Sequence, residues 1–521
     1  MFNNIKRLFI SCIKYYVFGL FILSHLFGGQ PLSAKQTANN QKLNFVFILT
    51  DDLGWRGLTC YGSTFYETPN IDKLATQGMR FTDNYAAAPL CSATRACLMS
   101  GKYPARLHIT GAVGHGPPRK KAKKTQTERK GPPWRKLVPA DQEDYMALEE
   151  ITIAEMLKSA GYVTAFIGKW HLGKHPYYPE NQGFDINIGG NHQAAAPSHF
   201  DPYRLQNLTN RKEGEYLADR LTDEALTFLE QHKDKPFFLY LPHYAVHTPI
   251  MAKKELIKKY QAKIKPGQKQ KNPTYAGMIQ SVDESVGRIM RKLDQLNLAD
   301  RTVVIFTSDN GGLVHIPRAA GDLVTSNEPL RGWKATLWEG GIRVPLIVRW
   351  PGAVKAGSEC NVPVVTADFY PTILEIAGIK PNPQQVLDGE SILPLLKQSG
   401  KLKRRAIYFH FPHYIPGHHQ PEGKLRKYWT KPVSVVRQGD YKLLYFDDDR
   451  HVELYNLKDD ISETNNLADK MPKLAEQLHN RLLDWRKEVN ANLCNPNPQY
   501  DPDYVYKEPP SKKKKAGKKK Q

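Results

Sequence analysis

The stretch Asn44-Phe45-Val46-Phe47-Ile48-Leu49-Thr50 contains a continuous apolar run. Such a run is typical of a strand that is buried on both faces, as in a parallel sheet covered by helices. Strands that alternate with helices predict an α/β fold built on a large, mostly parallel sheet. Further strand patterns lie at 163–167, 236–241, 302–307 and 344–348, and helical patterns lie between them at 71–77, 153–160, 221–232 and 275–296.

The pattern changes near residue 400, where short strands follow one another and Gly439-Asp440 supplies a hairpin turn. We therefore predict a larger domain over 42–400 and a smaller C-terminal α+β subdomain over 401–492, with an antiparallel sheet and one helix. Residues 493–521 are rich in Pro and Lys and are predicted to form a disordered tail. The expected strands are 406–411, 433–437, 441–446 and 452–455, and the expected helix is 471–489.

The N-terminus has the pattern of a secretory signal peptide. Basic residues precede an apolar run over 15–27, and 31–34 offers a cleavage site with small residues. We predict a signal peptide over 1–34 and export to the periplasm or the cell exterior. The apolar run is shorter than the roughly 20 residues that a transmembrane helix needs, so we expect no stable membrane span.

The formal net charge of +22 is concentrated in two segments. Residues 511–521 contain seven lysines, and 119–136 contain nine basic residues and one Glu within a long surface loop expected over 114–144. Such blocks are typical of a solvated tail, a nucleic-acid-binding segment or a segment that binds an acidic polymer such as a sulfated polysaccharide. Predicted export argues against the second, so we expect no nucleic-acid partner.

Side chains with oxygen ligands follow two of the apolar strands. Asp51-Asp52 comes directly after the first strand, and Asp309-Asn310 follows the strand at 302–307. In open α/β sheets, ligands bind beyond the carboxyl ends of the strands. Three carboxylates and one amide suit a hard divalent cation, Ca²⁺ before Mg²⁺, although Asp and Asn are also ordinary turn formers.

A second candidate site is the pentapeptide Cys91-Ser92-Ala93-Thr94-Arg95. If a helix begins at Ser92 or Ala93, Arg95 returns beneath residue 91 within one turn, and both side chains face one pocket. Cys91 is then either a small buried side chain or a thiolate whose pKa is lowered near a helix N-terminus. Five cysteines follow the predicted signal peptide, an odd number, and we expect Cys91 to be the unpaired one.

Basic side chains follow three other segments. Lys169 and His171 come after the strand pattern at 163–167, and alternate residues of an extended chain point the same way. His247 follows another strand pattern, and Lys334 lies in a later loop bounded by glycine. Each of them alone would be assigned a surface or structural role. Their joint placement indicates a cationic site.

Together, these motifs resemble those of type I sulfatases, a branch of the alkaline phosphatase superfamily. The two family signatures match the segment around Cys91 and the segment 161–171, and the Asp-Asp, His-x-Pro, Asp-Asn-Gly-Gly and late Lys elements follow in the family's order. The resemblance runs from about Asn44 to the end of the C-terminal subdomain. It implies an alkaline phosphatase-like sandwich and the hydrolysis of sulfate esters to an alcohol and inorganic sulfate.

The resemblance also implies two cofactors. Cys91 would be oxidised after translation to formylglycine, and one hydroxyl of its hydrated gem-diol would attack sulfur. One Ca²⁺ ion would be bound by the modified residue 91 together with the four side chains at the strand ends, Asp51, Asp52, Asp309 and Asn310.

The remaining matched residues receive catalytic roles from the same resemblance. Asp309 would be the base, and Arg95 would hold the diol. Lys169, His247 and Lys334 would contact the sulfate oxygens, and His247 or Lys334 would protonate the leaving alcohol. A second hydroxyl proton would pass to His171, so that sulfate is expelled and the aldehyde returns.

Position 93 departs from the commonest family motif, because Ala93 stands where Pro is usual, and Thr94 stands where Ser is frequent. In the family, the aerobic formylglycine-generating oxidase strongly favours Pro there, whereas the oxygen-independent radical enzyme accepts Ala. We therefore expect a maturation partner of the second kind, or a relaxed variant of the first.

The expected substrate is a sulfated saccharide or an aryl sulfate, as in arylsulfatases and N-acetylgalactosamine-6-sulfatases. Candidates for recognising the leaving group are the Asn191-His192 loop, His315, Arg318 and the region 411–419. Two other functions stay open. One is a phosphomonoester or phosphodiester hydrolase of the same superfamily, and the other is a non-catalytic binder of sulfated glycans in which Cys91 stays a thiol.

Overall fold

The computed structural model describes residues 42–113, 129–315, 323–416 and 428–504. The described chain from Leu43 onward forms one compact unit. The signal peptide predicted at 1–34, most of the basic block at 119–136 and the Lys-rich end of the chain lie outside the described residues.

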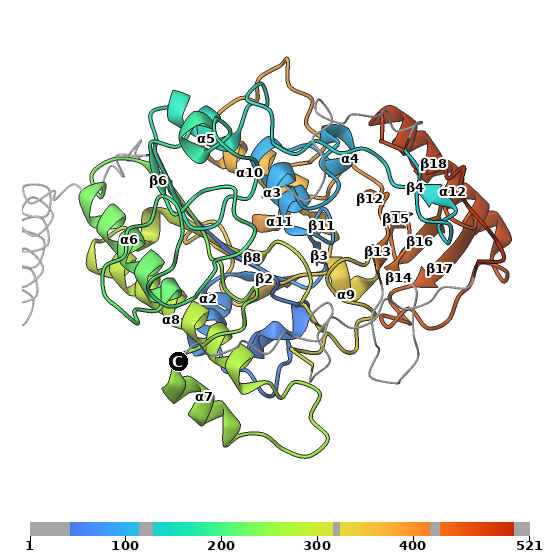
Figure 1. Ribbon diagram of the computed structural model, residues 1–521. Helices are drawn as coiled ribbons and strands as arrows, with labels where there is room; N and C mark the ends of the chain where they lie inside the picture. The colour runs from blue at the N-terminus through green and yellow to red at the C-terminus, as the bar shows by residue number, and fades with distance from the viewer. Residues whose placement is uncertain (1–41, 114–128, 316–322, 417–427, 505–521) are drawn as a thin grey trace, which may run out of the picture. The chain divides into compact units, whose positions relative to one another are not determined.

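The larger sheet is mostly parallel, as predicted (Figure 1). Its strands are β1 (Asn44–Thr50), β2 (Met79–Phe81), β5 (Val163–Ile167), β6 (Ile186–Ile188), β7 (Phe237–Pro242), β8 (Thr302–Ser308), β9 (Leu346–Arg349) and β10 (Ser358–Cys360), in the order β10-β2-β9-β8-β1-β7-β5-β6. The strands from β8 to β6 run parallel to one another. Antiparallel pairing joins β9 to β8 and β2 to β9.

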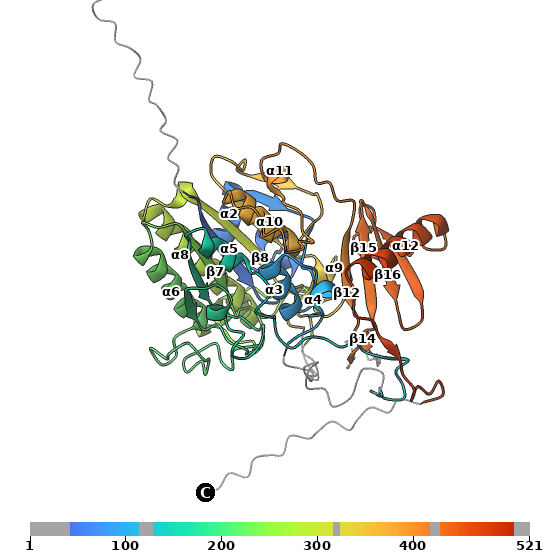
Figure 2. The ribbon, with the colours of Figure 1, turned by 90° about the horizontal axis from the view of Figure 1, so that it is seen from above.

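Helices cover both faces of this sheet, which is why the first strand has no polar face (Figure 2). Val46 and Ile48 of β1 belong to one apolar cluster, whereas Phe45, Phe47 and Leu49 belong to the cluster on the opposite face. The first cluster includes residues of α2 (Pro69–Gln77), α6 (Leu217–Gln231), α7 (Lys254–Gln261) and α8 (Pro273–Gln295). The second includes residues of α3 (Cys91–Ser100), α5 (Ile153–Ser159), α10 (Phe369–Ile376) and α11 (Leu393–Leu396).

The C-terminal part forms a second sheet, antiparallel throughout, in the order β12-β15-β16-β17. Its elements are β12 (Ile407–Phe411), β15 (Val433–Gln438), β16 (Tyr441–Phe446) and β17 (His451–Asn456), with helix α12 (Pro472–Glu488) packed against it. Its apolar face is buried together with Tyr85 and Cys97 of the larger part, in one shared cluster. The two sheets are therefore joined by a common core.

Part of the tail differs from the sequence prediction. Residues 493–504 are described, and β18 (Asn495–Pro496) pairs with β4 (Leu137–Val138). The Asn497 side chain donates to the carbonyls of Pro132 and Arg135. These hydrogen bonds order a segment whose composition alone suggested disorder, and the remainder of the predicted tail, 505–521, lies outside the described residues.

Shorter elements complete the described fold. They are β3 (Asn84–Tyr85), β11 (Val364–Val365), β13 (Ile415–Pro416), β14 (Tyr428–Thr430), α4 (Pro104–Leu107), α9 (Glu339–Ile342) and the 3-10 turns η1 (Trp55–Gly57), η2 (Thr59–Tyr61), η5 (Pro179–Asn181), η6 (Ala299–Arg301) and η7 (Thr366–Asp368). Among the described helices, none is long and apolar enough to cross a membrane.

Candidate active site

The ends of β1 and β8 bring the four predicted oxygen ligands together. Thr50 and Ser308 are paired in register, so the residues that follow them emerge side by side at the carboxyl edge of the sheet. The backbone N–H of Asp52 donates to Oδ1 of Asp309 over 3.2 Å, and Nδ2 of Asn310 donates to Oδ1 of Asp52 over 2.8 Å. All four side chains are buried.

Each of the three carboxylates is paired with one of the predicted cations. Nζ of Lys169 lies 2.5 Å from Asp51, and Nζ of Lys334 lies 2.7 Å from Asp52. The third pair joins Arg95 to Asp309, with Nη2 of the guanidinium 2.7 Å from Oδ2. Pairing of this kind is what allows charged groups to stay buried.

Cys91 is the first residue of α3, and Arg95 follows it one turn later, as predicted from their spacing. Sγ of Cys91 lies 3.3 Å from Nδ1 of His171. Arg95 also donates from Nη1 to the carbonyl of Lys169, over 2.6 Å. Ser92, which the sequence analysis did not select, donates its hydroxyl to the carbonyl of His171. These hydrogen bonds join helix α3 to the segment after β5 at the site.

His171 has a defined protonation pattern. Its Nε2 lies 3.1 Å from the carbonyl of Val113, to which it donates. Burial, Lys169 and Arg95 lower the pKa of His171 well below its ordinary value. The ring is therefore neutral at physiological pH, with its lone pair at Nδ1 toward Cys91.

His247 lies beside the carboxylates, with Nε2 3.7 Å from Oδ2 of Asp52. Asp51, Asp52 and His247 offer three ligand atoms within 4.8 Å of one another. The buried His199, which the sequence analysis missed, contacts the carbonyl of His247 through Nε2 over 3.1 Å. His199 lies in an irregular segment, and no local pattern in the sequence pointed to it.

Burial and neighbouring charges shift the pKa values of Asp309 and Asp51 in opposite directions. Burial and the nearby Asp51 raise the pKa of Asp309 to about 6, despite Arg95 and Lys169. Burial alone would also raise the pKa of Asp51, but Lys169, His247 and Arg95 outweigh it and hold that pKa below its ordinary value. The two residues therefore differ in their readiness to take a proton.

Cys91 is a free, buried side chain. Burial raises the pKa of its thiol, although Lys169 and Lys334 act in the opposite direction. An unmodified Cys91 is thus protonated at neutral pH, which makes it a poor nucleophile. The interpretation of Cys91 as a low-pKa thiolate finds no support in this environment.

The donor set fits a hard divalent cation. Oδ1 of Asp51 and Oδ1 of Asn310 are buried and have no hydrogen-bond partner in the described part of the chain. A buried oxygen without a partner is costly, and a cation would satisfy both. Oxygen ligands from carboxylates and amides are those that Ca²⁺ prefers.

Comparison with known families decides the class. Residues 43–379 match the family model described as "Sulfatase", and residues 332–488 match "N-sulphoglucosamine sulphohydrolase, C-terminal". The chain belongs to the sulfatase family. It is accordingly a sulfuric ester hydrolase with the alkaline phosphatase-like sulfatase fold.

The sulfatase is similar to several characterised proteins over most of its length. It is 32% identical to "Sulfatase" of Formosa agariphila, over 92% of this chain and 94% of the relative. It is 34% identical to human N-acetylgalactosamine-6-sulfatase, over 77% and 74% of the two chains. The solved structure of "Ps i-CgsB in complex with k-i-k-neocarrahexaose" is 29% identical, with a TM-score of 0.68 over 86% of this chain and 93% of that one.

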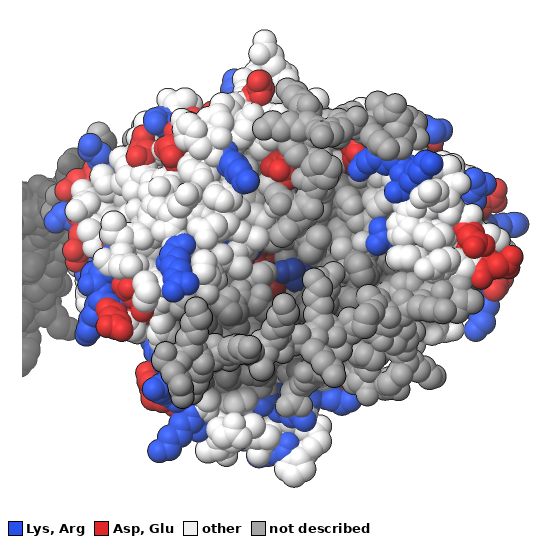
Figure 3. Space-filling model, in the orientation of Figure 1, with Lys and Arg blue, Asp and Glu red and all other residues white. Residues whose placement is uncertain are grey.

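The surface of the sulfatase carries both signs of charge. On the face shown in Figure 3, the described Lys and Arg side chains are interspersed with Asp and Glu, and a hollow near the middle has a basic and an acidic group at its floor.

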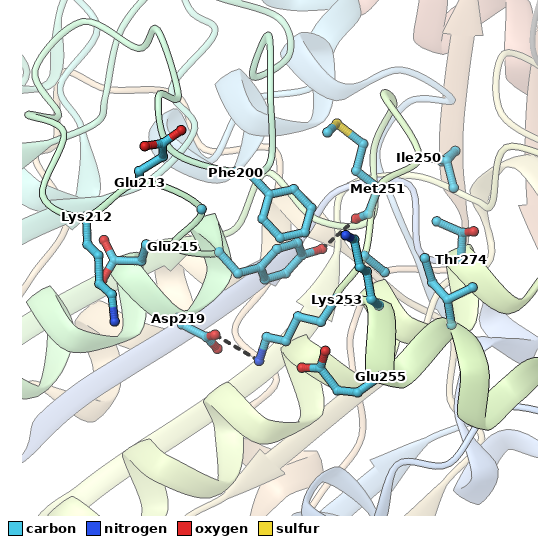
Figure 4. A pocket seen from close by; sticks show the side chains of 15 residues that line it. Phe200, Lys212, Glu213, Glu215, Asp219, Ile250, Met251, Lys253, Glu255 and Thr274 are labelled. Atoms are coloured by element: carbon cyan, nitrogen blue, oxygen red, sulfur yellow. Dashed lines mark hydrogen bonds and ion pairs between the residues drawn. The ribbon is translucent and has the colours of Figure 1, made fainter.

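A pocket of about 930 Å³ lies near the His247 segment of the sulfatase (Figure 4). Phe200 and Met251 line it, and Lys253 reaches across to Asp219 over 2.8 Å. Phe200 directly follows His199, so this pocket shares two chain segments with the site. Its rim mixes acidic and basic side chains, which gives no preference for an anion.

The candidates for leaving-group recognition are only partly described. His171 N donates to the carbonyl of Asn191, which places the Asn191-His192 loop against the site. His315 packs against Trp333, next to Lys334. Arg318 and residues 417–419 lie outside the described residues.

Proposed function

We propose that this sulfatase removes sulfate from a carbohydrate, using formylglycine at position 91 and calcium at the ends of β1 and β8. The observation that carries the proposal is the convergence of Cys91, three carboxylates and three cations at one largely buried site. Similarity to an N-acetylgalactosamine-6-sulfatase and to a protein crystallised with an oligosaccharide supports the carbohydrate part.

Two cofactors belong to this proposal. Formylglycine would supply a hydrated aldehyde as the oxygen nucleophile, and calcium would supply positive charge beside that nucleophile and the sulfate. Asp51, Asp52, Asp309 and Asn310 would hold the ion through their oxygens, together with the modified residue 91. Support comes from the unpartnered oxygens of Asp51 and Asn310.

The chain's own residues handle the protons. Arg95 orients position 91 from one turn below, while Asp309 holds the guanidinium in place. Asp309 serves as the base, since burial and the nearby Asp51 raise its pKa above the ordinary value of a carboxyl group and make it readier to take a proton. The neutral His171 presents the Nδ1 lone pair 3.3 Å from the side chain at position 91 and takes a second proton there.

Three side chains stabilise the sulfate. A sulfuryl group in transfer carries negative charge on its outer oxygens, so fixed positive charge around it lowers the barrier. Lys169 and Lys334 lie on the strand-end carboxylates and supply that charge, and His247, whose pKa is lowered by burial and by Lys334, lies beside them as a neutral ring. Either His247 or Lys334 protonates the leaving alcohol.

Maturation and export complete the proposal. The pattern at 1–34 directs the chain to the periplasm or the exterior, where a sulfated saccharide is the partner. Because Ala93 replaces the usual Pro, the enzyme that converts Cys91 is of the oxygen-independent type or a relaxed variant of the aerobic oxidase. Mass spectrometry of two peptides from the native source tests conversion and cleavage: the Cys91 peptide reports on formylglycine, and the N-terminal peptide of the mature chain reports on the signal. A thiol throughout would exclude the formylglycine mechanism, and a peptide that begins before residue 34 would exclude cleavage of the signal.

Paired assays test the reaction class. We expect turnover of p-nitrophenyl sulfate at least about a hundredfold above that of p-nitrophenyl phosphate, because the site is assigned to sulfate. Faster turnover of the phosphate ester would instead support the phosphoesterase alternative. A panel of sulfated galactose and N-acetylgalactosamine derivatives then tests whether the substrate is a carbohydrate. Hydrolysis of the aryl sulfate without hydrolysis of any sugar in the panel would contradict this part of the proposal.

A further inference from the structure

Three aromatic rings meet beside the loop that carries Lys334. The ring of Trp333 lies 5.0 Å from that of His315 and 5.8 Å from that of Trp429, at interplanar angles of 74° and 89°. These residues come from three segments far apart in the sequence, and Trp429 belongs to the β14 strand of the C-terminal part. Edge-to-face contacts of this kind fix the orientation of each ring.

Two of these rings line a cavity of about 970 Å³. His315 and Trp333 form its aromatic side, while Trp429 is buried and supports Trp333 edge-on. The volume is at the upper end of the range of about 300–1,000 Å³ that is typical of small-molecule sites. The aromatic side is therefore accessible to a ligand considerably larger than sulfate.

The rest of the cavity lining is largely polar. Its two basic side chains, Lys269 and Arg331, have acidic partners in Glu328 and Glu453. Lys269 lies 3.5 Å from Glu328, so their charges largely offset each other. Such a lining favours hydroxyl groups over additional anionic groups.

Two chain segments run from the sulfate site to the aromatic residues of the cavity. Trp333 directly precedes Lys334, whose Nζ lies on Asp52, and consecutive Cα atoms are only about 3.8 Å apart. The other segment begins at Asn310 in the site and reaches His315 five residues later. Between these two residues, the carbonyl of Gly312 accepts a hydrogen bond from the backbone N–H of Lys334. A group attached to a sulfate at Lys334 therefore lies within reach of Trp333.

Trp333 also has an unused donor. Its Nε1 is buried and has no hydrogen-bond partner in the described part of the chain. Indole N–H groups in buried positions usually find a partner. A ligand oxygen in the cavity reaches this donor only after the Trp333 ring has moved, because the atom is closed off from solvent.

We propose that this cavity is a saccharide subsite in which Trp333 and His315 contact a pyranose ring of the sugar that bears the sulfate. A pyranose has apolar CH faces, which match the two aromatic rings, and hydroxyl edges, which match the polar side chains of the lining. This inference rests on the proposed carbohydrate sulfatase function and adds the residues that select the leaving group.

The test compares two substrates in two variants, Trp333→Ala and Trp333→Phe. The substrates are p-nitrophenyl sulfate and the sulfated saccharide of the panel with the highest wild-type kcat/KM. We expect Trp333→Ala to lower kcat/KM for the saccharide at least about tenfold more than for the aryl sulfate, and Trp333→Phe to restore most of the difference, since a ring–ring contact is worth about a factor of ten. His315→Ala should shift the same ratio in the same direction.

Binding is measured separately from turnover. Titration calorimetry with the same saccharide on Cys91→Ser protein, and on that protein with Trp333→Ala added, should show the same loss in affinity without any need for formylglycine. Trp350→Ala is the matched control, because Trp350 is partly buried in a different cluster. It should change neither the ratio nor the affinity, and thermal melting of every variant shows that it folds.

The outcomes separate the two proposals. Equal losses on both substrates with unchanged binding would overturn the subsite and leave the sulfatase function standing. A larger loss on the aryl sulfate would assign the rings to an aryl leaving group and would also overturn it. If the wild-type protein with converted Cys91 hydrolyses no saccharide of the panel, the carbohydrate function fails first.

Discussion

At the scale of single residues, the site is a set of opposite charges that are buried together. Asp51, Asp52 and Asp309 each have a cationic partner, and the three pairs lie within one buried region. Removing one charge from such a set leaves its partner uncompensated, which costs far more than the pair contributes. Because of this asymmetry, the effect of replacing a residue of the site can be measured in the free energy of unfolding as well as in the activity.

The first prediction concerns calcium. Adding millimolar Ca²⁺ to the chelated protein should raise its melting temperature by several degrees, because an ion that binds only the folded state stabilises it. In Asn310→Ala, which removes one ligand oxygen without removing a charge, the shift should be much smaller. Scanning calorimetry at a series of Ca²⁺ concentrations measures both. An equal shift in the variant would contradict the assignment of Asn310 as a ligand.

The second prediction concerns Arg95. Arg95→Ala should lower the free energy of unfolding by about 3–5 kcal/mol, because Asp309 loses its buried partner. It should also lower kcat strongly, since position 91 loses its support. Urea denaturation of the chelated protein measures the first effect. Lys487→Ala is the control, because its pair with Asp484 is exposed and should contribute less than about 1 kcal/mol. Similar losses in the two variants would count against the role of Arg95.

At the scale of elements, the loop that presents Lys334 is clamped at both ends by Glu463. The backbone carbonyl of Glu463 accepts from Nη1 of Arg331 over 2.9 Å, and its Oε2 accepts from the N–H of Glu339 over 2.7 Å. Lys442 lies 2.8 Å from both Glu339 and Glu463. The C-terminal sheet therefore helps to position an active-site lysine.

The third prediction concerns this clamp and pH. Burial, opposed by Lys442 and reinforced by Glu339, raises the pKa of Glu463 to about 7 in the folded state. Between about pH 4.5 and 7 the folded protein therefore binds more protons at this residue than the unfolded chain does, so its contribution to stability falls as pH rises. Glu463→Gln removes that dependence. The stability of the variant relative to wild type should accordingly increase across this window.

Urea denaturation at half-unit pH steps measures the difference. Glu359→Gln serves as the control, because the Glu359 side chain is 52% exposed. The stability of this variant relative to wild type should change little with pH. A difference between Glu463→Gln and wild type that stays constant from pH 4.5 to 7 would contradict the buried, proton-binding state of Glu463.

At the scale of the whole molecule, the two sheets share one apolar cluster. Tyr85 and Cys97, on the side of the larger sheet, are buried with Val435 of β15 and Leu478 and Trp485 of α12. Cutting the chain at residue 400, the predicted boundary, would expose the first group of side chains to water. The boundary predicted at residue 400 thus marks a change in the sequence pattern of strands and helices. It does not separate two hydrophobic cores.

The fourth prediction follows from this shared cluster. A chain ending at residue 400 should bind the dye ANS and lose cooperative thermal unfolding, because apolar surface that is normally buried becomes exposed. A chain ending at residue 504, which keeps every contact described here, should melt like the full-length protein. Cooperative melting of the shorter chain would show that the larger domain folds independently.

Several features follow from the sequence alone. Unbroken apolar runs such as Asn44–Thr50 can be buried only between two layers, so they predict the parallel sheet and place Asp51 and Asp309 at its carboxyl edge. Helical spacing likewise predicts that Arg95 lies beneath Cys91. These inferences succeed because strand and helix periods are local properties of the chain.

The tertiary structure alone decided which groups meet. Nothing near Lys169 in the sequence shows that it pairs with Asp51, or that His199 supports His247, because these contacts join segments brought together only by packing of the sheet. The order of residues 493–504 depends in the same way on pairing with β4. The sequence determined the fold class and the chemistry of the side chains at the strand ends, whereas charge pairing, burial and pKa depend on long-range contacts and were set by the fold.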